Sequence, residues 1–208
     1  MIYLYIDTTT DYLYAALSDD NALFSEKKIK LEHNLSKDAL YEITKMFEEN
    51  KLSPDSVDKI IVCNGPGSFT GTRIGITIAK VYAWAKNIPV TTTNALLSMA
   101  LSSSKKCVHV PILDARRDHV YTAIYDSNYK EILKPCHILL SELQEKLTNI
   151  DDYDLISNDE FDDIKTDSYD PDLFKIISFN KDNEIINPHA VNPEYLKLTA
   201  AEEKKLND

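Results

Sequence analysis

All four glycines of this 208-residue chain lie in one short stretch, from Gly65 to Gly75. Average usage would scatter glycine along the chain at about 7% of positions. Glycine is needed where a backbone turns sharply or passes very close to another group, so this stretch holds the unusual backbone of the molecule. The residues before it, Lys59 to Cys63, read as a short buried strand, and Ile74 to Ala85 read as a helix. A glycine loop between a strand and a helix is suited to dock an anion or another piece of backbone.

Neither of the common nucleotide-binding motifs fits this loop. The dinucleotide pattern G-x-G-x-x-G needs glycine where the chain has Thr70, and no acidic residue ends the next predicted strand at residues 91–94. The phosphate-loop pattern needs Gly-Lys-Ser or Gly-Lys-Thr, which the chain lacks. The loop by itself therefore does not favour a nucleotide site.

The chain is acidic, because 34 Asp and Glu residues against 23 Lys and Arg residues give a net charge of −11. Such a surface repels phosphate backbones unless basic residues gather locally, and no basic cluster is visible. The acid is densest between Asp151 and Asp172, where we expect a solvated, mobile surface segment.

The cysteines and the first residues bear on the compartment. The three cysteines form no C-x-x-C pair, and their odd number argues against a disulfide framework. The N-terminal residues lack a basic segment and a long apolar run, so we expect a cytoplasmic protein without a signal peptide or a membrane span.

The apolar periodicity predicts strands that alternate with helices. Ser36 is the predicted N-cap of the first helix, and Ser53-Pro54 opens a brief helical turn. The predicted strands are residues 3–7, 12–18, 24–30, 59–63, 89–93, 108–113 and 154–157, and the predicted helices are residues 36–50, 74–85, 95–101 and 141–147.

A second copy of the first unit begins at residue 108. When Asp7 is aligned with Asp114 without a gap, Tyr14 meets Tyr121 and the apolar phase of the following strands is kept. A duplicated βββαβα unit predicts an α/β protein with a two-lobed, actin-like fold, the RNase H-like architecture of the actin, sugar-kinase and Hsp70 superfamily. We place the first lobe at residues 1–106 and a smaller second lobe at residues 107–208.

The glycine stretch also belongs to a long, specific string. It resembles the GPGSFTGxRIG signature of the TsaB family, also called YeaZ, the glycoprotease-like dimerisation subunit of bacterial tRNA threonylcarbamoyladenosine synthesis. Residues 6–9, 113–116 and 192–197 agree with the same family, so the resemblance covers most of the chain. The signature residues are Gly65, Pro66, Gly67, Ser68, Phe69, Thr70, Gly71 and Arg73.

This resemblance implies a noncatalytic subunit. Such a protein binds a TsaD-like catalytic subunit and, with a TsaE-like ATPase, supports transfer of a threonylcarbamoyl group to the adenosine beside the tRNA anticodon. The chain would meet tRNA only through the complex, and a homodimer is one possible state of the isolated protein. The resemblance also implies that the tail, partly helical over residues 193–206, packs on the first lobe. The alternative is a free-standing small-molecule kinase or ATPase of the same fold, and a peptidase is a distant third.

The residues themselves predict no catalytic, metal or cofactor site. No two of the five histidines are four residues apart, and His33, where the TsaD paralogue carries H-x-x-x-H, is followed four residues later by Lys37. Ser68 does not lie in a G-x-S-x-G elbow. The ATPases of the superfamily carry Asp-x-Gly-Thr after the first strand, whereas Asp7 is followed by three threonines and the turn after Asp114 also lacks glycine. We expect these two aspartates to cap their turns.

The helix after the loop is apolar on two faces, a broad one and a narrow one of small residues. The broad face is Ile74, Ile78, Val81, Tyr82 and Ala85, and the small-residue face is Gly75, Ala79 and Ala83. We expect the broad face to cover the sheet and the small-residue face to admit another helix. That helix belongs either to a partner or to the chain itself, over residues 36–50, and the two contacts are compatible. The predicted interface residues are Gly75, Ile76, Ala79, Tyr82, Ala83, Leu40, Ile43 and Phe47.

Overall fold

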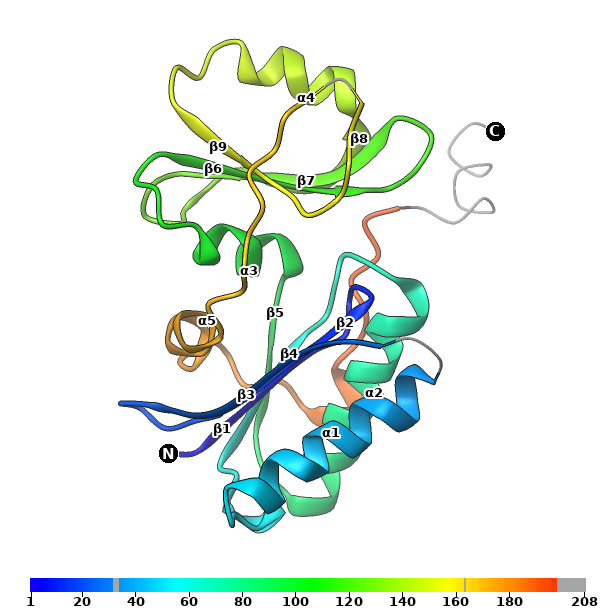
Figure 1. Cartoon of the computed structure of the whole chain (residues 1–208), viewed down its shortest axis with the longest axis vertical. Helices are drawn as coiled ribbons and strands as arrows, with labels where there is room; N and C mark the ends of the chain where they lie inside the picture. The colour runs from blue at the N-terminus through cyan, green and yellow to red at the C-terminus, as the bar shows by residue number, and fades with distance from the viewer. Residues whose placement is uncertain (32–33, 163, 198–208) are drawn as a thin grey trace.

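The computed structural model describes residues 1–31, 34–162 and 164–197, which form two mixed sheets with helices around them (Figure 1). The first sheet has the strand order β3-β2-β1-β4-β5. Its strands are β1 (Tyr3–Asp7), β2 (Tyr12–Ser18), β3 (Leu23–Lys30), β4 (Lys59–Cys63) and β5 (Val90–Thr93). The first three strands form an antiparallel meander, whereas β4 and β5 extend the sheet parallel to β1.

The second sheet repeats this arrangement with one strand fewer, in the order β8-β7-β6-β9. Its strands are β6 (Val108–Asp114), β7 (His119–Tyr125), β8 (Glu131–Leu139) and β9 (Tyr153–Ile156). Again the first three are antiparallel and the fourth runs parallel to the first. The repeated strand order confirms the predicted α/β fold built on a duplicated unit. The boundary between residues 106 and 107 stays a prediction.

Helices cover the sheets and separate them. They are α1 (Leu35–Glu49), α2 (Phe69–Lys86), α3 (Ala95–Ser102), α4 (Leu140–Leu147) and α5 (Leu173–Asn180), with 3-10 turns η1 (Pro54–Ser56) and η2 (Pro188–Ala190). Figure 1 shows α1 and α2 on one face of the first sheet, α5 on its other face, α3 between the two sheets and α4 on the far side of the second sheet.

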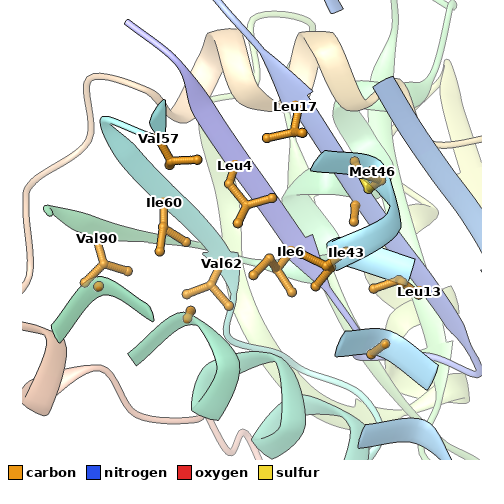
Figure 2. Close-up of a cluster of buried hydrophobic side chains, with 14 of the residues drawn as sticks. Leu4, Ile6, Leu13, Leu17, Ile43, Met46, Val57, Ile60, Val62 and Val90 are labelled. Atoms are coloured by element: carbon orange, nitrogen blue, oxygen red, sulfur yellow. The ribbon is translucent and has the colours of Figure 1, made fainter. Parts of the chain in front are cut away.

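The largest core lies between the first sheet and helices α1 and α2. Leu4 and Ile6 of β1 point toward these helices, and Figure 2 shows Ile6 beside Ile43 of α1. Tyr3 and Tyr5 alternate with them and pack on the opposite face, where α5 lies. All five residues of β1 are buried, as expected for a central strand that is covered on both faces.

Most predicted strands and helices lie within two residues of the observed ones. The predicted N-cap of α1 and the predicted start of α2 were wrong. The N-cap of α1 is Asn34, whose side chain accepts a hydrogen bond from the Lys37 N–H, so Ser36 lies inside the helix. Helix α2 begins at Phe69, well before the predicted Ile74, because the Ser68 side chain caps it inside the glycine stretch.

Among the described residues of the acidic segment from residue 151 to 172, most carboxylates are exposed, as expected, but the segment is not solvated throughout. Its mobility stays a prediction. Asp154 is buried on β9 and accepts hydrogen bonds from the Ser103 hydroxyl at 2.5 Å and the Lys105 ammonium at 2.8 Å. Asp172 caps α5 by accepting the Lys175 N–H at 2.9 Å. Acidic residues of this segment therefore bind a lysine and cap the start of a helix. Helix α5 itself was not predicted.

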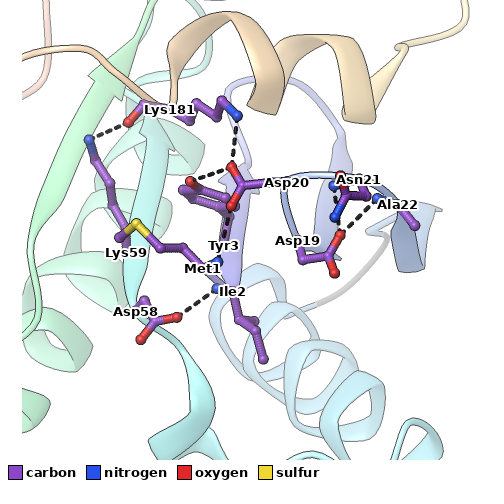
Figure 3. Close-up of polar contacts among 10 residues, drawn as sticks. All are labelled: Met1, Ile2, Tyr3, Asp19, Asp20, Asn21, Ala22, Asp58, Lys59 and Lys181. Carbon is purple, nitrogen blue, oxygen red and sulfur yellow. Dashed lines mark hydrogen bonds and ion pairs between the residues drawn. The ribbon is translucent and has the colours of Figure 1, made fainter.

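The end of α5 is tied to the first sheet by charged groups (Figure 3). The Asp20 carboxylate accepts from the Met1 amine at 3.1 Å, the Tyr3 hydroxyl at 3.0 Å and the Lys181 ammonium at 2.7 Å. These donors, Lys181 first, lower the pKa of Asp20. Lys59 is buried on β4 and donates to the Lys181 carbonyl at 2.5 Å, which holds the end of the helix.

The two first hairpins differ in register by one residue. Asp7 lies opposite Tyr14 in the first sheet, whereas in the second sheet Leu113 lies opposite Tyr121. Asp7 and Leu113 line the same small cavity between the sheets. The structural equivalent of Asp7 is therefore Leu113, and the ungapped alignment of Asp7 with Asp114 was wrong by one residue, because the second turn contains one more residue than the first.

Candidate docking surface around the glycine loop

The glycine loop packs against the turn between β1 and β2. The Ser68 N–H donates to the Thr9 carbonyl at 2.6 Å, and the Thr8 hydroxyl donates to the Gly71 carbonyl at 2.7 Å. A Cβ atom on Gly67 or Gly71 would overlap the carbonyl oxygen of Thr9 or Thr8, respectively. Glycine is required at both positions because two backbone segments touch there.

The loop uses two of the N–H groups that would otherwise attract an anion, those of Ser68 and Gly71. The first N–H groups of a helix have no partner within the helix, and they favour negative charge. In α2, the Ser68 hydroxyl accepts the N–H of Gly71, which is one of these groups, at 3.2 Å, and the first bond within the helix runs from the Thr72 N–H to the Ser68 carbonyl at 2.9 Å. The Thr9 carbonyl takes the N–H of Ser68 itself. The loop thus docks the chain's own backbone where a phosphate loop docks a phosphate.

On its other side the loop holds the C-terminal segment. The Glu194 N–H donates to the Asn64 carbonyl at 2.8 Å, and the Asn94 amide donates to the Glu194 carboxylate at 3.1 Å. A Cβ atom on Gly65 would lie 3.0 Å from the Glu194 carbonyl oxygen. Residues 193–197 are not helical, and the rest of the predicted tail helix lies outside the described residues.

Asp7 is buried at the end of β1, between the two sheets. Its Oδ1 accepts the N–H and the hydroxyl of Thr9 at 2.8 and 2.7 Å, and its Oδ2 accepts the Tyr5 hydroxyl at 3.2 Å. Burial raises the pKa of Asp7, and the hydrogen bonds oppose that shift. The adjacent cavity of about 10 Å³ has room for about one water molecule. Asp7 caps its turn as predicted, and Asp114 does so by accepting the Arg116 N–H at 2.7 Å.

Across residues 1–31, 34–162 and 164–197, no helix is both long enough and apolar enough to cross a membrane. In the same ranges, the His, Cys, Asp and Glu side chains form no group of three that is placed to hold a metal ion. The expectation for His33 falls outside the described residues.

Helix α2 packs on the sheet with the face opposite to the predicted one. The small residues Gly75, Ala79 and Ala83 are buried, and a Cβ atom on Gly75 would lie 2.6 Å from the Thr8 hydroxyl. Val81, from the broad face, is 58% exposed. The prediction that the small-residue face binds another subunit is therefore wrong. Small side chains let the helix lie close to the sheet, whose own larger side chains fill the core.

Most of the other predicted interface residues are also internal. Ile76, Ile43 and Phe47 lie in the chain's own core, so a partner cannot reach them. Tyr82 is half-buried, and its ring packs edge-on against Phe47 at a centroid distance of 6.3 Å, so α1 and α2 cover each other within the chain. Leu40, by contrast, is 53% exposed and stays open to a partner.

A different set of large apolar side chains faces solvent on the same two helices. Tyr41 of α1 and Trp84 of α2 are 62% and 65% exposed, and Val81 lies one turn before Trp84. Next to them, α2 and the start of α1 border an open groove of about 380 Å³, which we call the α2 groove. It is lined by Ser36, Phe69, Thr70, Arg73, Ile74, Thr77 and Ile78. Exposed aromatic residues beside a groove are typical of protein-binding surfaces.

The signature residues divide between two tasks. Gly65, Gly67 and Gly71 allow close backbone contacts, Ser68 caps α2 and Pro66 is buried, whereas Phe69, Thr70 and Arg73 line the α2 groove. The sequence analysis missed Tyr195, which contacts Phe69 and Arg73. Its segment, residues 192–197, agreed with the family, but nothing in it indicated which residues it touches.

Comparison with known proteins agrees with these observations. The family model described as "TsaD: tRNA N6-adenosine threonylcarbamoyltransferase" matches residues 30–167. The tRNA threonylcarbamoyladenosine biosynthesis protein TsaB of Bacillus subtilis is 29% identical over 98% of this chain and 97% of its own length. TsaB of Escherichia coli is 31% identical over 59% of this chain and 54% of its own length.

Solved structures show the same fold. A Pseudomonas aeruginosa protein described as similar to peptidase YeaZ superposes with a TM-score of 0.77 at 20% identity, covering 94% of this chain and 99% of that one. YeaZ from Pseudomonas aeruginosa gives a TM-score of 0.75 at 21% identity with the same coverage. With its signature loop, its two related sheets and its relatives along nearly the whole length, the chain belongs to the TsaB/YeaZ family.

Proposed function

We propose that this chain is a noncatalytic subunit in tRNA threonylcarbamoyladenosine biosynthesis, which binds and supports a TsaD-like catalytic subunit. Relatives that carry the TsaB name in this pathway support the pathway assignment. The match to the TsaD family model over residues 30–167 supports kinship with the catalytic subunit. A TsaE-like ATPase and tRNA join through the complex, in the cytoplasm.

One observation carries the partner role: the exposed apolar side chains on α1 and α2. Leu40, Tyr41, Val81 and Trp84 are each more than half exposed, although the interior faces of the same helices are fully used by the chain's own core. Exposed large side chains at this density cost solubility unless another protein covers them. Trp and Tyr are also the residues that contribute most when an interface is truncated.

The noncatalytic role is supported by the surroundings of Asp7, between the two sheets. The glycine loop packs against the turn at Thr8 and Thr9. Both carboxylate oxygens of Asp7 accept hydrogen bonds from the chain itself. A free-standing kinase or ATPase would need those groups for its phosphates and metal ion. The net charge of −11 supports contact with tRNA through the complex rather than directly.

The test compares two equally exposed apolar side chains. Val81 on α2 and Ile132 on β8 are each 58% exposed. We expect Val81→Glu to weaken binding to the purified TsaD-like subunit of the same organism by about 100-fold, because it places an unpaired carboxylate in the contact. Ile132→Glu should bind like the wild type. Binding is measured by isothermal titration calorimetry, and circular dichroism checks the fold.

The proposal fails if the wild-type chain does not bind that subunit, or if the two variants bind equally well. Turnover of ATP by the isolated chain would favour the kinase or ATPase alternative. Sedimentation of the chain alone shows whether Val81→Glu also breaks a homodimer.

A further inference from the structure

Three side chains form a stack at the edge of the α2 groove. The Arg73 guanidinium carbon lies 3.8 Å from the centroid of the Phe69 ring, and the Phe69 and Tyr195 rings stack at a centroid distance of 5.4 Å. The Arg73 Nε donates to the Tyr195 hydroxyl at 2.7 Å. All three side chains are on the surface: Phe69 is 57% exposed and Tyr195 is 49% exposed. An exposed arginine is usually mobile, and here one ring face and one hydrogen bond restrain it.

Tyr195 is placed by the packing of the whole C-terminal segment. Lys80 of α2 donates to the carbonyls of His189 and Val191 at 3.1 and 3.0 Å. Val191 is buried in the main core, and the Glu194 N–H bonds to the strand end below the glycine loop. Tyr195 therefore approaches Arg73 from a segment that is anchored at several points.

The guanidinium keeps donors for a further ligand. An arginine side chain has five N–H donors, and only the one on Nε is used by Tyr195. In the described part of the chain, no acceptor is hydrogen-bonded to the two terminal nitrogens, and no carboxylate pairs with Arg73. The N–H groups on these two terminal nitrogens are spaced to bind both oxygens of a carboxylate.

Charge identifies the chemistry of the occupant. Among the residues that the structure describes, Arg73 is the single charged one that lines the α2 groove, whereas the chain as a whole has a net charge of −11. The remaining lining combines the apolar Ile74 and Ile78 with hydroxyl groups. One cation beside an apolar floor suits a protein segment with one carboxylate and apolar neighbours. A nucleic acid would require a basic patch.

We propose that Phe69 and Tyr195 hold the Arg73 guanidinium as a preformed receptor for a carboxylate on a segment of the TsaD-like subunit. The groove continues along α2 into the exposed face at Val81 and Trp84, so one partner covers both. This inference rests on the proposed function. It assigns Arg73 to direct contact and makes Tyr195 a positioning residue, which acts on the partner through Arg73. The C-terminal segment then contributes to docking through Tyr195, which orients Arg73.

A double-mutant cycle on binding to the purified TsaD-like subunit tests this assignment. We expect Arg73→Gln to weaken binding about 30-fold, Tyr195→Ala about 10-fold and Tyr195→Phe, which keeps the ring and loses the hydroxyl, about 3-fold. The double variant should bind like Arg73→Gln alone, because Tyr195 has no effect without the guanidinium. The salt dependence of affinity should also shrink in Arg73→Gln. Tyr153→Ala, a 39% exposed tyrosine on the second sheet, is the matched control.

The outcomes separate this inference from the proposed function. Wild-type binding that is sensitive to Val81→Glu but indifferent to Arg73→Gln and Tyr195→Ala overturns the receptor and leaves the proposed function standing. Additive losses in the cycle overturn the positioning role of Tyr195. Variants that change only self-association, measured by sedimentation, or only binding of tRNA by the isolated chain, would assign the groove to another occupant and also overturn it. Thermal unfolding of each variant confirms that the fold is intact.

Discussion

The two first hairpin turns begin with the same residue type and have opposite surroundings. In the first turn, Thr8 and Thr9 are each 1% exposed and lie under the glycine loop. In the second turn, Arg116, Arg117 and Asp118 are exposed, and all three have positive φ angles, of 66°, 54° and 61°. Residues with side chains rarely adopt this left-handed conformation.

This difference shows that a duplicated turn keeps its geometry only where another element packs on it. The first turn is held by contacts to residues more than fifty positions away, such as the Thr8 hydroxyl bond to Gly71. The second turn is held mainly by its own hydrogen bonds, and the Asp114 N–H donates to Asp159 at 2.8 Å. Changes in the first turn should therefore affect the whole lobe, whereas changes in the second should stay local.

The largest expected effect comes from Gly71→Ala, which should destabilise the protein by about 3 kcal/mol or more. The new methyl group would overlap the Thr8 carbonyl, so backbone must move in the loop or in the turn. Urea unfolding followed by circular dichroism measures the change. Thr77→Ala, at an exposed position of the same helix, is the control and should change stability by about 0.5 kcal/mol or less. Equal stability of the two variants would show that the turn does not depend on the loop.

Removing the two turn aspartates should give unequal losses. Asp7→Ala leaves the Thr9 N–H and hydroxyl and the Tyr5 hydroxyl without their acceptor, and we expect a loss of about 2 kcal/mol. The loss is limited because burial already disfavours the charged carboxylate, as its raised pKa indicates. Asp114→Ala removes one exposed hydrogen bond and should cost about 0.5 kcal/mol. Thermal unfolding at pH 7 compares them, and equal losses would contradict the conclusion that tertiary packing holds the first turn and local hydrogen bonds hold the second.

The smallest expected effect is a gain in stability of about 0.5 kcal/mol for Arg117→Gly. Glycine adopts the positive φ of 54° without strain, and this relief exceeds the extra entropy of the unfolded chain. Arg117→Ala keeps the Cβ atom and should show no gain. Calorimetric melting temperatures of the two variants decide the point, and a loss in the glycine variant would mean that the arginine side chain itself stabilises the turn.

Much of the fold could be predicted because its signals are local. The strands β1, β2 and β4 were predicted to the residue from buried or alternating apolar side chains, and the cap of α3 was found from Asn94. Helix α5 was missed because it is short and follows a strongly acidic segment. Its apolar residues Leu173, Ile176 and Ile177 are explained only by the sheet they cover.

The candidate docking surface was also predicted only in part from the sequence. The glycine string alone located the loop and carried the family resemblance, but it did not indicate that α2 begins inside it, at Phe69. It did not reveal which face of α2 packs inward, because a helix with two apolar faces satisfies periodicity either way. The choice depends on how closely the helix approaches the sheet, and Thr8 against Gly75 determines that distance.

The sequence by itself determined where most of the strands and helices lie, that the unit is duplicated and that the unusual backbone lies between residues 65 and 75, because composition and periodicity are properties of neighbouring residues. Only the tertiary structure decided that this loop docks the β1–β2 turn and Glu194, that Val81 and Trp84 of α2 face solvent and that Tyr195 meets Arg73. Those contacts join residues more than fifty positions apart, and no local pattern encodes the close packing that selects them.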